Sequence, residues 1–404
     1  MKSKTCYLKT LFFLFHIVYI ISSALGLAPC GIKISRGLTS KIGFTCVFSY
    51  SSRRCAYNLL LIMLFIAITI AGVPHLHHLS YPNNSPAVRV ITVALSVMGN
   101  VVAIVIITFY LITQRDIISI GNQLNEFDEK YGDRLVGRRD TGVGDFQSLI
   151  TVIIITCIWI AVVTSEMVEA EGEIFLLTSG PSEAFVSWLL IQYSLLINVL
   201  QARFEGLNNA LFATFRPAII LKEGSFVRRS IFSDTAITQS LLMCKQARNR
   251  IYKVSCKVSR FYSFPALIGI FYCCCCFVDT IYFYIMTLIY LENSGRNQID
   301  PIFWTLVTLY PIVALSTSVN TFQTEEARTM DIIYDIMEAY APNKDIESEL
   351  NNFAVELLHK NVPFNACALF SLDCSLLHSI FAMTVTYLLI LVQFKPPESH
   401  KSTE

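Results

Sequence analysis

Charged residues are scarce in this chain of 404 residues, and long uncharged runs take their place. Asp, Glu, Lys and Arg make up 15% of the sequence and hydrophobic residues 54%, with a mean hydropathy of +0.54. This composition lies outside the range of soluble globular domains. We therefore expect a membrane protein.

The sequence also lacks the motifs of common catalytic sites: it has no Walker loop, no dinucleotide-binding fingerprint and no nucleophile elbow. Four consecutive cysteines, Cys273 to Cys276, are interpreted as small packing residues because nothing in their spacing supports a metal site. The HLHH motif (His75, His77 and His78) is placed in an outside loop, where three histidines without a further ligand are more often incidental than metal-binding. We expect no enzyme, no cofactor and no metal site.

Seven apolar windows are long enough to cross a bilayer, since a spanning helix needs about 20 mostly apolar residues. Isolated strands cannot satisfy their backbone in hydrocarbon, and the alternating pattern of a barrel is absent. We therefore predict an all-α membrane protein whose seven transmembrane helices cover residues 57–73, 87–112, 146–168, 182–202, 265–291, 301–322 and 374–394.

The distribution of basic residues predicts the orientation of these helices. Lys and Arg number 8 in residues 1–56, 5 in 113–145, 10 in 212–264 and 3 in 323–373, against three in the segments on the other side. The positive-inside rule then places the N-terminus in the cytoplasm and the C-terminus outside. A G-protein-coupled receptor, the seven-span alternative, needs its N-terminus outside and would export these basic segments.

One further apolar stretch, residues 10–27, follows Lys2, Lys4 and Lys9 and precedes small residues. A signal peptide is the alternative interpretation. Its cleavage would place five basic residues between positions 33 and 54 outside, against the positive-inside rule. We predict instead a helix that lies in or packs against the cytoplasmic interface.

No internal repeat and no Gly-, Ser- or Pro-rich linker divides the chain, so we predict one polytopic unit over residues 1–404. Apolar residues at helical spacing in 203–262 and 323–360 predict extensions of the spans below the membrane, which need partners in each other or in neighbouring subunits. The expected parts are an N-terminal region with an interfacial helix (1–56), six helices with a ligand pocket (57–322), cytoplasmic helices (323–373) and a last, pore-lining helix (374–394).

Polar residues form one stripe on the last span. On a helical wheel, Leu377, Ile380, Leu388, Leu391 and Val392 lie opposite this stripe, with Thr384 as the exception, and Asp373 is placed to cap the helix. The stripe either bonds to a neighbouring helix or faces water in a pore formed by several copies of the chain, and periodicity alone favours packing. Its members are Ser375, Ser379, Ala382, Thr386, Leu389 and Gln393.

Aromatic and polar residues gather in the predicted outer half of the bundle, as in a small-molecule pocket, although interfacial aromatic belts give the same pattern. Asp279 interrupts the fifth span, where a charge costs about 2.5–3.5 kcal/mol, so it faces a wet cavity or a polar helix. It also favours a transporter, which the lack of repeats and broken helices disfavours. The candidate ligand-binding residues are Glu166, Trp188, Gln192, Tyr193, Asp279, Tyr282, Tyr284 and Trp304.

The stretch TYLLILVQF, residues 386–394, joins Thr-Tyr to Gln-Phe through five apolar residues. It resembles the signature that closes the last span of insect gustatory receptors. The preceding run ACALFSLDCSLLHSIFAMTV and the stretch LGLAP, Leu25 to Pro29, are similar to the corresponding parts of that family. The resemblance covers the seven-span plan, the inverted topology and the short outside tail.

This resemblance implies a ligand-gated, non-selective cation channel whose last helix lines a central pore and whose cytoplasmic helix extensions form an anchor region between subunits. Carried onto this chain, Gln393 and Phe394 match the gate near the outer mouth, and Thr386 and Tyr387 match the start of the motif. Leu389 and Ser379 complete the expected pore residues. The absence of an acidic ring on the stripe fits weak ion selectivity.

The resemblance also implies a place and partners for the protein. The place is the plasma membrane of a gustatory neuron. The partners are a small-molecule tastant, the lipid bilayer and further subunits, as a homotetramer or a heteromer with other gustatory receptors, with no nucleic acid. A bitter or plant secondary compound is the default tastant, and a sugar-sensing receptor of the same fold is the alternative.

Overall fold

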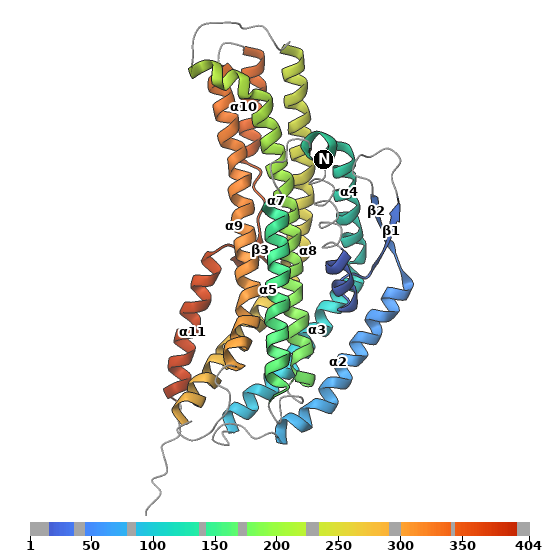
Figure 1. The fold of residues 1–404 in the computed structure, drawn as a ribbon, viewed down its shortest axis with the longest axis vertical. Coiled ribbons are helices and arrows are strands. Elements are labelled where there is room, and N and C mark those ends of the chain that lie inside the picture. The colour runs from blue at the N-terminus through green and yellow to red at the C-terminus, as the bar shows by residue number, and fades with distance from the viewer. Residues whose placement is uncertain are drawn as a thin grey trace, which may run out of the picture.

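The structure, a computed structural model, describes residues 16–35, 45–78, 86–136, 143–168, 176–223, 234–290, 300–340 and 344–393. They form an elongated helical bundle with two small hairpins (Figure 1). The helices are α2 (Ser52–His78), α3 (Pro86–Ile112), α4 (Gln114–Val136), α5 (Val143–Glu166), α7 (Gly180–Glu223), α8 (Asp234–Tyr290), α9 (Asp300–Tyr340), α10 (Lys344–Leu358) and α11 (Ser375–Gln393). The strands are β1 (Cys30–Ser35), β2 (Thr45–Tyr50), β3 (Asn365–Ala366) and β4 (Phe370–Ser371).

Six helices, α2, α3, α5, α7, α8 and α9, are long and apolar enough to cross a membrane. Each covers one predicted span, although α5 ends two residues and α8 one residue before the predicted boundary. The seventh predicted span is α11, whose 19 residues extend over about 28 Å, close to the thickness of a hydrocarbon core. The predicted all-α fold with seven apolar helices is therefore confirmed.

The two ends of the molecule differ. The lower end in Figure 1 collects the ends of α2, α5, α8 and α11, whereas the upper end consists of the long extensions of α7, α8 and α9 with α10. The basic segments predicted to be cytoplasmic belong to this upper part. The charge distribution therefore assigns the lower end to the outside, and the orientation itself stays a prediction.

The extensions of α7, α8 and α9 pack on one another, as their apolar stripes predict. The rings of Phe204 in α7 and Phe322 in α9 meet edge to face with centroids 5.0 Å apart. Ile251 of α8 and Ile333 of α9 are fully buried. The stripes thus find partners within one chain.

Two elements were not predicted: helix α4 and the antiparallel β1–β2 hairpin, in which Cys30 pairs with Tyr50 and Ser35 with Thr45. Helix α4 and the hairpin are joined by two hydrogen bonds. The side chain of Asn122 in α4 accepts from the backbone N–H of Phe48 in β2 at 2.9 Å and donates to the Phe48 carbonyl at 3.1 Å. A Cβ at Gly121 would lie 2.6 Å from the Phe48 ring, so only glycine admits this contact.

The segment between α10 and α11 differs from the predicted helices of 323–373. It leaves helical geometry after Leu358 and forms the β3–β4 hairpin, with positive φ angles at Cys367 and Ala368. Glu326 of α9 holds its start, since its carboxylate accepts from the backbone N–H of Val362 at 3.2 Å and lies 3.8 Å from the Arg248 guanidinium of α8.

The buried Arg248–Glu326 pair generates a stability prediction. Both side chains are under 10% exposed, so Glu326→Ala leaves the buried guanidinium without its counter-charge and the Val362 N–H without its acceptor. Breaking a buried pair by removing one partner costs about 3–5 kcal/mol. We expect a clearly lower melting temperature for the purified protein in detergent.

The matched control is Arg328→Ala, which removes a half-exposed charge that pairs with Glu325 at 3.5 Å one turn away. Such surface pairs contribute about 0–1 kcal/mol. Equal melting temperatures for the two variants would contradict the prediction.

Candidate functional site

Two tryptophans, Trp159 and Trp304, connect α5, α7 and α9 through hydrogen bonds and a ring contact at the end of the bundle assigned to the outside. Trp304 of α9 donates from its indole nitrogen to a Glu166 carboxylate oxygen of α5 at 2.5 Å. Trp159 of α5 lies edge to face with Trp304 at 6.1 Å and donates to the Ser187 hydroxyl of α7 at 3.2 Å. The predicted residues Glu166 and Trp304 are therefore direct neighbours.

A small cavity lies beside this contact. It measures about 10 Å³, room for one water molecule, and is lined by Glu183, Ser187, Tyr272, Cys273, Val307 and Thr308. Glu183 of α7 also interacts electrostatically with Asp279 of α8 and with Glu166. Three acidic side chains from three helices thus surround one place in the outer part of the bundle.

Two of these acids have oxygen atoms that lack a protein donor. Oε2 of Glu183 and Oδ1 of Asp279 are buried and have no hydrogen-bond partner in the described parts of the chain. Leaving a buried carboxylate oxygen unsatisfied is costly, and the cost is removed by a proton, a water molecule or a cationic ligand. Acids beside indole rings match the chemistry that recognises a positively charged group.

The two predicted tyrosines of α8 lie on different sides of that helix. Tyr282 is buried and lies three residues after Asp279, on the same side of the helix, whereas Tyr284 is half-buried and points to another side. The structure therefore brings Glu166, Asp279, Trp304 and Tyr282 to one end of the bundle, but none of the eight predicted ligand residues lines the small cavity.

The other three predicted ligand residues, all in α7, have different neighbours. Trp188 donates to the Ser22 hydroxyl at 2.9 Å, and Gln192 donates to the Leu27 carbonyl at 3.4 Å. Tyr193 stacks on Tyr262 of α8 with centroids 4.4 Å apart. None of the three lines the outer cavity.

The partner of Trp188 and Gln192 is an N-terminal segment inside the bundle. Residues 16–24 are helical, as predicted for part of 10–27, while 10–15 lie outside the described residues. The LGLAP stretch that follows is largely buried, and Gly26 has a φ of 77°. A Cβ there would also lie 2.9 Å from Leu61, so the turn requires glycine.

Side chains of two further helices, α2 and α4, also satisfy the backbone of this segment. Asn58 of α2 donates to the Gly26 carbonyl at 2.8 Å, Gln114 donates to the Pro29 carbonyl, and Arg54 donates to the Ala28 carbonyl at 3.1 Å. Backbone carbonyls that are buried away from water require such donors. The predicted interfacial helix therefore leads into a buried anchor, here called the N-terminal anchor (residues 22–30).

Helix α11 presents its polar stripe outward. Leu376, Ile380 and Thr384, spaced four residues apart, are buried against α8 and α9. Every described member of the predicted stripe is exposed: Ser375, Ser379, Ala382, Thr386, Leu389 and Gln393. The stripe therefore packs on no described helix of the same chain, which removes one of its two interpretations within a single subunit.

The remaining details of α11 agree with the sequence. Asp373 caps it by accepting from the backbone N–H of Ser375 at 2.9 Å, and the hydrogen bonds from Ser375 lower the pKa of the Asp373 carboxyl. Tyr387 is half-exposed beside the stripe. Phe394 lies outside the described residues.

The histidines of the HLHH motif lie in the last turn of α2 rather than in a loop, because the helix continues past Pro74. Within the described ranges, no group of three His, Cys, Asp or Glu side chains is arranged to hold a metal ion.

Sequence reasoning missed two residues of the site. Glu183 is an acid one residue inside a predicted span, which is the same signal that identified Asp279. Trp159 lies seven residues before Glu166, a spacing that places both on one face of α5.

Comparisons with known proteins agree with this architecture. The sequence profile of a family described as 7tm Chemosensory receptor matches residues 15–397. The fold is similar to the insect olfactory receptor OR5 from Machilis hrabei, with a TM-score of 0.63 and 13% identity, covering 96% of this chain and 99% of that one. The eugenol complex of that receptor matches with a TM-score of 0.61, 13% identity and coverage of 95% and 99%.

Three Drosophila melanogaster proteins match parts of the sequence. Gustatory and pheromone receptor 32a is 27% identical over 164 residues, 37% of this chain and 34% of its own length. Putative gustatory receptor 2a is 43% identical over 51 residues, 13% of this chain and 12% of its own. Gustatory receptor 68a is 29% identical over 98 residues, 24% of each. The matches thus span about a third or less of each relative.

The N-terminal anchor generates a labelling prediction. Cys30 is 3% exposed, and burial raises the pKa of its thiol to about 11, so little reactive thiolate exists at neutral pH. Asn58→Ala removes the donor to the Gly26 carbonyl, which costs about 1–3 kcal/mol. We expect the maleimide labelling rate of Cys30, followed by peptide mass spectrometry, to rise about tenfold or more.

The control is Asn125→Ala in α4, which removes an exposed amide that bonds to Glu129 in the same helix. Labelling of the exposed Cys367 should be equal in all proteins. If Cys30 in the unaltered protein reacts as fast as Cys367 does, the N-terminal anchor is not buried in the bundle and the prediction is wrong.

Proposed function

The chain belongs to the 7tm chemosensory receptor family, and from that premise we propose that it is a gustatory receptor that forms a ligand-gated, non-selective cation channel. Family membership makes it a multi-pass chemosensory receptor of the insect gustatory and odorant type rather than an enzyme. The proposal adds the channel, its tastant and its assembly.

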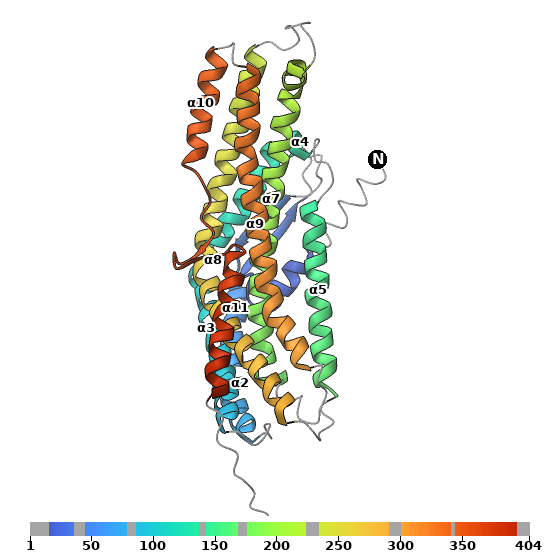
Figure 2. The ribbon, with the colours of Figure 1, turned by 90° about the vertical axis from the view of Figure 1, so that its left-hand side faces the viewer.

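The observation that carries the channel proposal is the environment of α11. A spanning helix with one narrow buried stripe and an outward row of Ser, Thr and Gln is unusual in a monomer, because polar groups avoid lipid. Around a symmetry axis, the same row from several copies lines an aqueous path. Figure 2 shows α11 at the periphery of the bundle, where a neighbouring copy has access to it.

The acidic cluster supports the choice of tastant. Glu183, which interacts electrostatically with Asp279 and Glu166, lines a cavity with room for one water molecule, whereas a drug-sized ligand requires about 300–1,000 Å³. Binding here therefore requires α5, α7, α8 or α9 to move apart. A bitter plant secondary compound with a protonated amine, such as an alkaloid, supplies the charge that these acids lack.

A short path joins the proposed pocket to the proposed pore. Phe277, two residues before Asp279 on α8, meets Phe381 of α11 edge to face at 6.1 Å. A ligand that favours a more open arrangement of α8 thereby shifts the helix against which α11 packs. In this proposal, helix α8 takes part both in ligand binding, through Asp279, and in gating, through the contact of Phe277 with α11.

The assembly that this requires has several copies around the pore, a homotetramer or a heteromer with other gustatory receptors, in the plasma membrane of a gustatory neuron. The extensions of α7, α8 and α9 lie at the cytoplasmic end, where they form the anchor region between subunits in the proposed assembly.

The first test is electrical. Cells that express this protein alone are given a panel of plant alkaloids, glycosides and sugars while G-protein signalling is blocked. We expect an inward cation current with cationic alkaloids. Asp279→Asn should raise the half-maximal agonist concentration at unchanged surface delivery, because the variant loses one charge of the acidic cluster.

Glu126→Gln is the control, since Glu126 is exposed at the cytoplasmic end. A response that vanishes when G proteins are blocked would contradict the channel, and a response to sugars alone would contradict the proposed tastant.

The second test maps the pore face. Ser379→Cys, Thr386→Cys and Leu389→Cys place thiols on the proposed water-lined stripe. We expect a charged methanethiosulfonate reagent applied outside to change the agonist-evoked current in each variant, because such reagents reach only wetted positions.

Val385→Cys is the control for Ser379→Cys and Thr386→Cys: Val385 is 58% exposed, but it lies about 100° or more around the helix from both. Equal modification of Val385→Cys and these two variants, or none at the stripe, would contradict the assignment of the pore face.

A further inference from the structure

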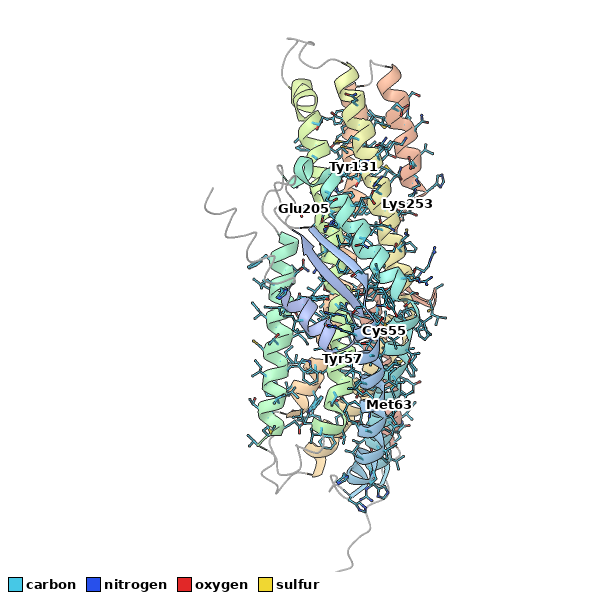
Figure 3. All side chains as sticks on the ribbon, turned by 90° about the vertical axis from the view of Figure 1, so that its right-hand side faces the viewer. Cys55, Tyr57, Met63, Tyr131, Glu205 and Lys253 are labelled. Carbon is cyan, nitrogen blue, oxygen red and sulfur yellow. The ribbon has the colours of Figure 1, made fainter. Side chains whose placement is uncertain are left out.

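A surface groove lies where the N-terminal helix meets the start of α2. It encloses about 390 Å³ and is lined by Tyr19, Ile20, Ser23, Ala24, Arg53, Arg54 and Tyr57. Figure 3 shows Tyr57 beside the helix of residues 16–24 and Met63 further along α2 toward the outer end.

The groove carries positive charge without a counter-ion. Arg54 is held in place by its hydrogen bonds to Ser23 and to the Ala28 carbonyl and by its position 4.8 Å above the Tyr19 ring. Arg53 is exposed and makes no hydrogen bond or ion pair within the described residues, and no acidic side chain lines the groove. Both guanidinium groups lie in the first turn of α2, where the helix dipole also favours an anion.

The sequence of α2 fixes the depth of the groove. Residues 55–74 contain no charged side chain and extend over about 30 Å, the thickness of a hydrocarbon core. Arg53 and Arg54 at one end and His75 at the other therefore lie at the two headgroup levels. The groove belongs to the cytoplasmic level.

An apolar surface continues from the groove into the membrane. Arg53, Tyr57, Leu60 and Leu64 recur at positions i, i+4, i+7 and i+11, so they share one face of α2. Tyr57, Leu60 and Leu64 are 39%, 61% and 48% exposed. This face combines a cationic end with an apolar strip of the kind that an acyl chain covers.

We propose that this groove binds an anionic phospholipid of the cytoplasmic leaflet, with its phosphate between Arg53 and Arg54 and one acyl chain along Leu60 and Leu64. The planar guanidinium fork matches phosphate oxygens, and anionic lipids are concentrated in the cytoplasmic leaflet. The site is independent of the proposed tastant pocket, which lies at the outer end.

The bound lipid would also stabilise the N-terminal anchor. Arg54 bonds to the Ala28 carbonyl, and the Tyr57 hydroxyl donates to the Ala24 carbonyl at 2.6 Å. A phosphate that neutralises Arg54 and orders the groove therefore acts on the segment that enters the bundle. The anchor becomes sensitive to the composition of the inner leaflet.

The test uses the purified full-length receptor in phosphatidylcholine nanodiscs to which phosphatidylserine or phosphatidylinositol is added. We expect the anionic lipids to raise the melting temperature and to remain bound in native mass spectra. Arg53→Gln should weaken this binding by about fivefold to tenfold. Because the Arg53 side chain is exposed, its replacement should not disturb folding. Arg54 is left unchanged because it forms hydrogen bonds to the N-terminal anchor.

Lys253→Gln is the matched control, because Lys253 is an exposed cytoplasmic cation of α8 outside the groove (Figure 3). Inorganic phosphate and glycerophosphoserine form the second arm. Equal loss in Lys253→Gln and Arg53→Gln would overturn the proposal in favour of unspecific attraction, and stabilisation by the soluble anions as strong as by the lipid would reassign the groove to free phosphate. An unchanged melting temperature with anionic lipid would also overturn it.

Discussion

A backbone polar group that is buried away from water needs a hydrogen-bond partner in the protein, and this constraint governs the arrangement around the N-terminal anchor. Its carbonyls take their donors from Asn58 on α2, Gln114 on α4 and Gln192 on α7. These hydrogen bonds connect three helices that are far apart in sequence. Helix α2 is otherwise largely exposed, so the anchor and the packing on α3 together give this peripheral helix a defined position.

The spans were predictable because each is a local property: a continuous apolar run, with basic residues to orient it. The stripe of α11 and its cap at Asp373 are local in the same sense and followed from helical spacing. The anchor was not predictable, since LGLAP has the composition of a loop and its partners stand at positions 58, 114 and 192. Helix α4 was missed because its amphipathic residues carry no long apolar run.

The same distinction applies to the candidate site. Glu166, Asp279 and Trp304 were identifiable because a charge or an indole inside a span is conspicuous in any one window. Their convergence is tertiary, as is the separation of Trp188, Gln192 and Tyr193 from them. A polar residue in a span indicates that a partner exists, but only the packing of α5, α7, α8 and α9 decides whether that partner is a backbone carbonyl or a ligand.

The unbroken length of α8 has a mechanical consequence. Its 57 residues extend over about 85 Å and contain Pro265, which removes one backbone hydrogen bond from the helix interior. Asp279 lies on one side of this proline and Arg248 on the other. The segment from Pro265 back to the start of α8 is about 46 Å long, so a bend of about 3° at the proline displaces that start by about 2.4 Å. A small angular change inside the membrane is thus geometrically amplified at the far end of the helix.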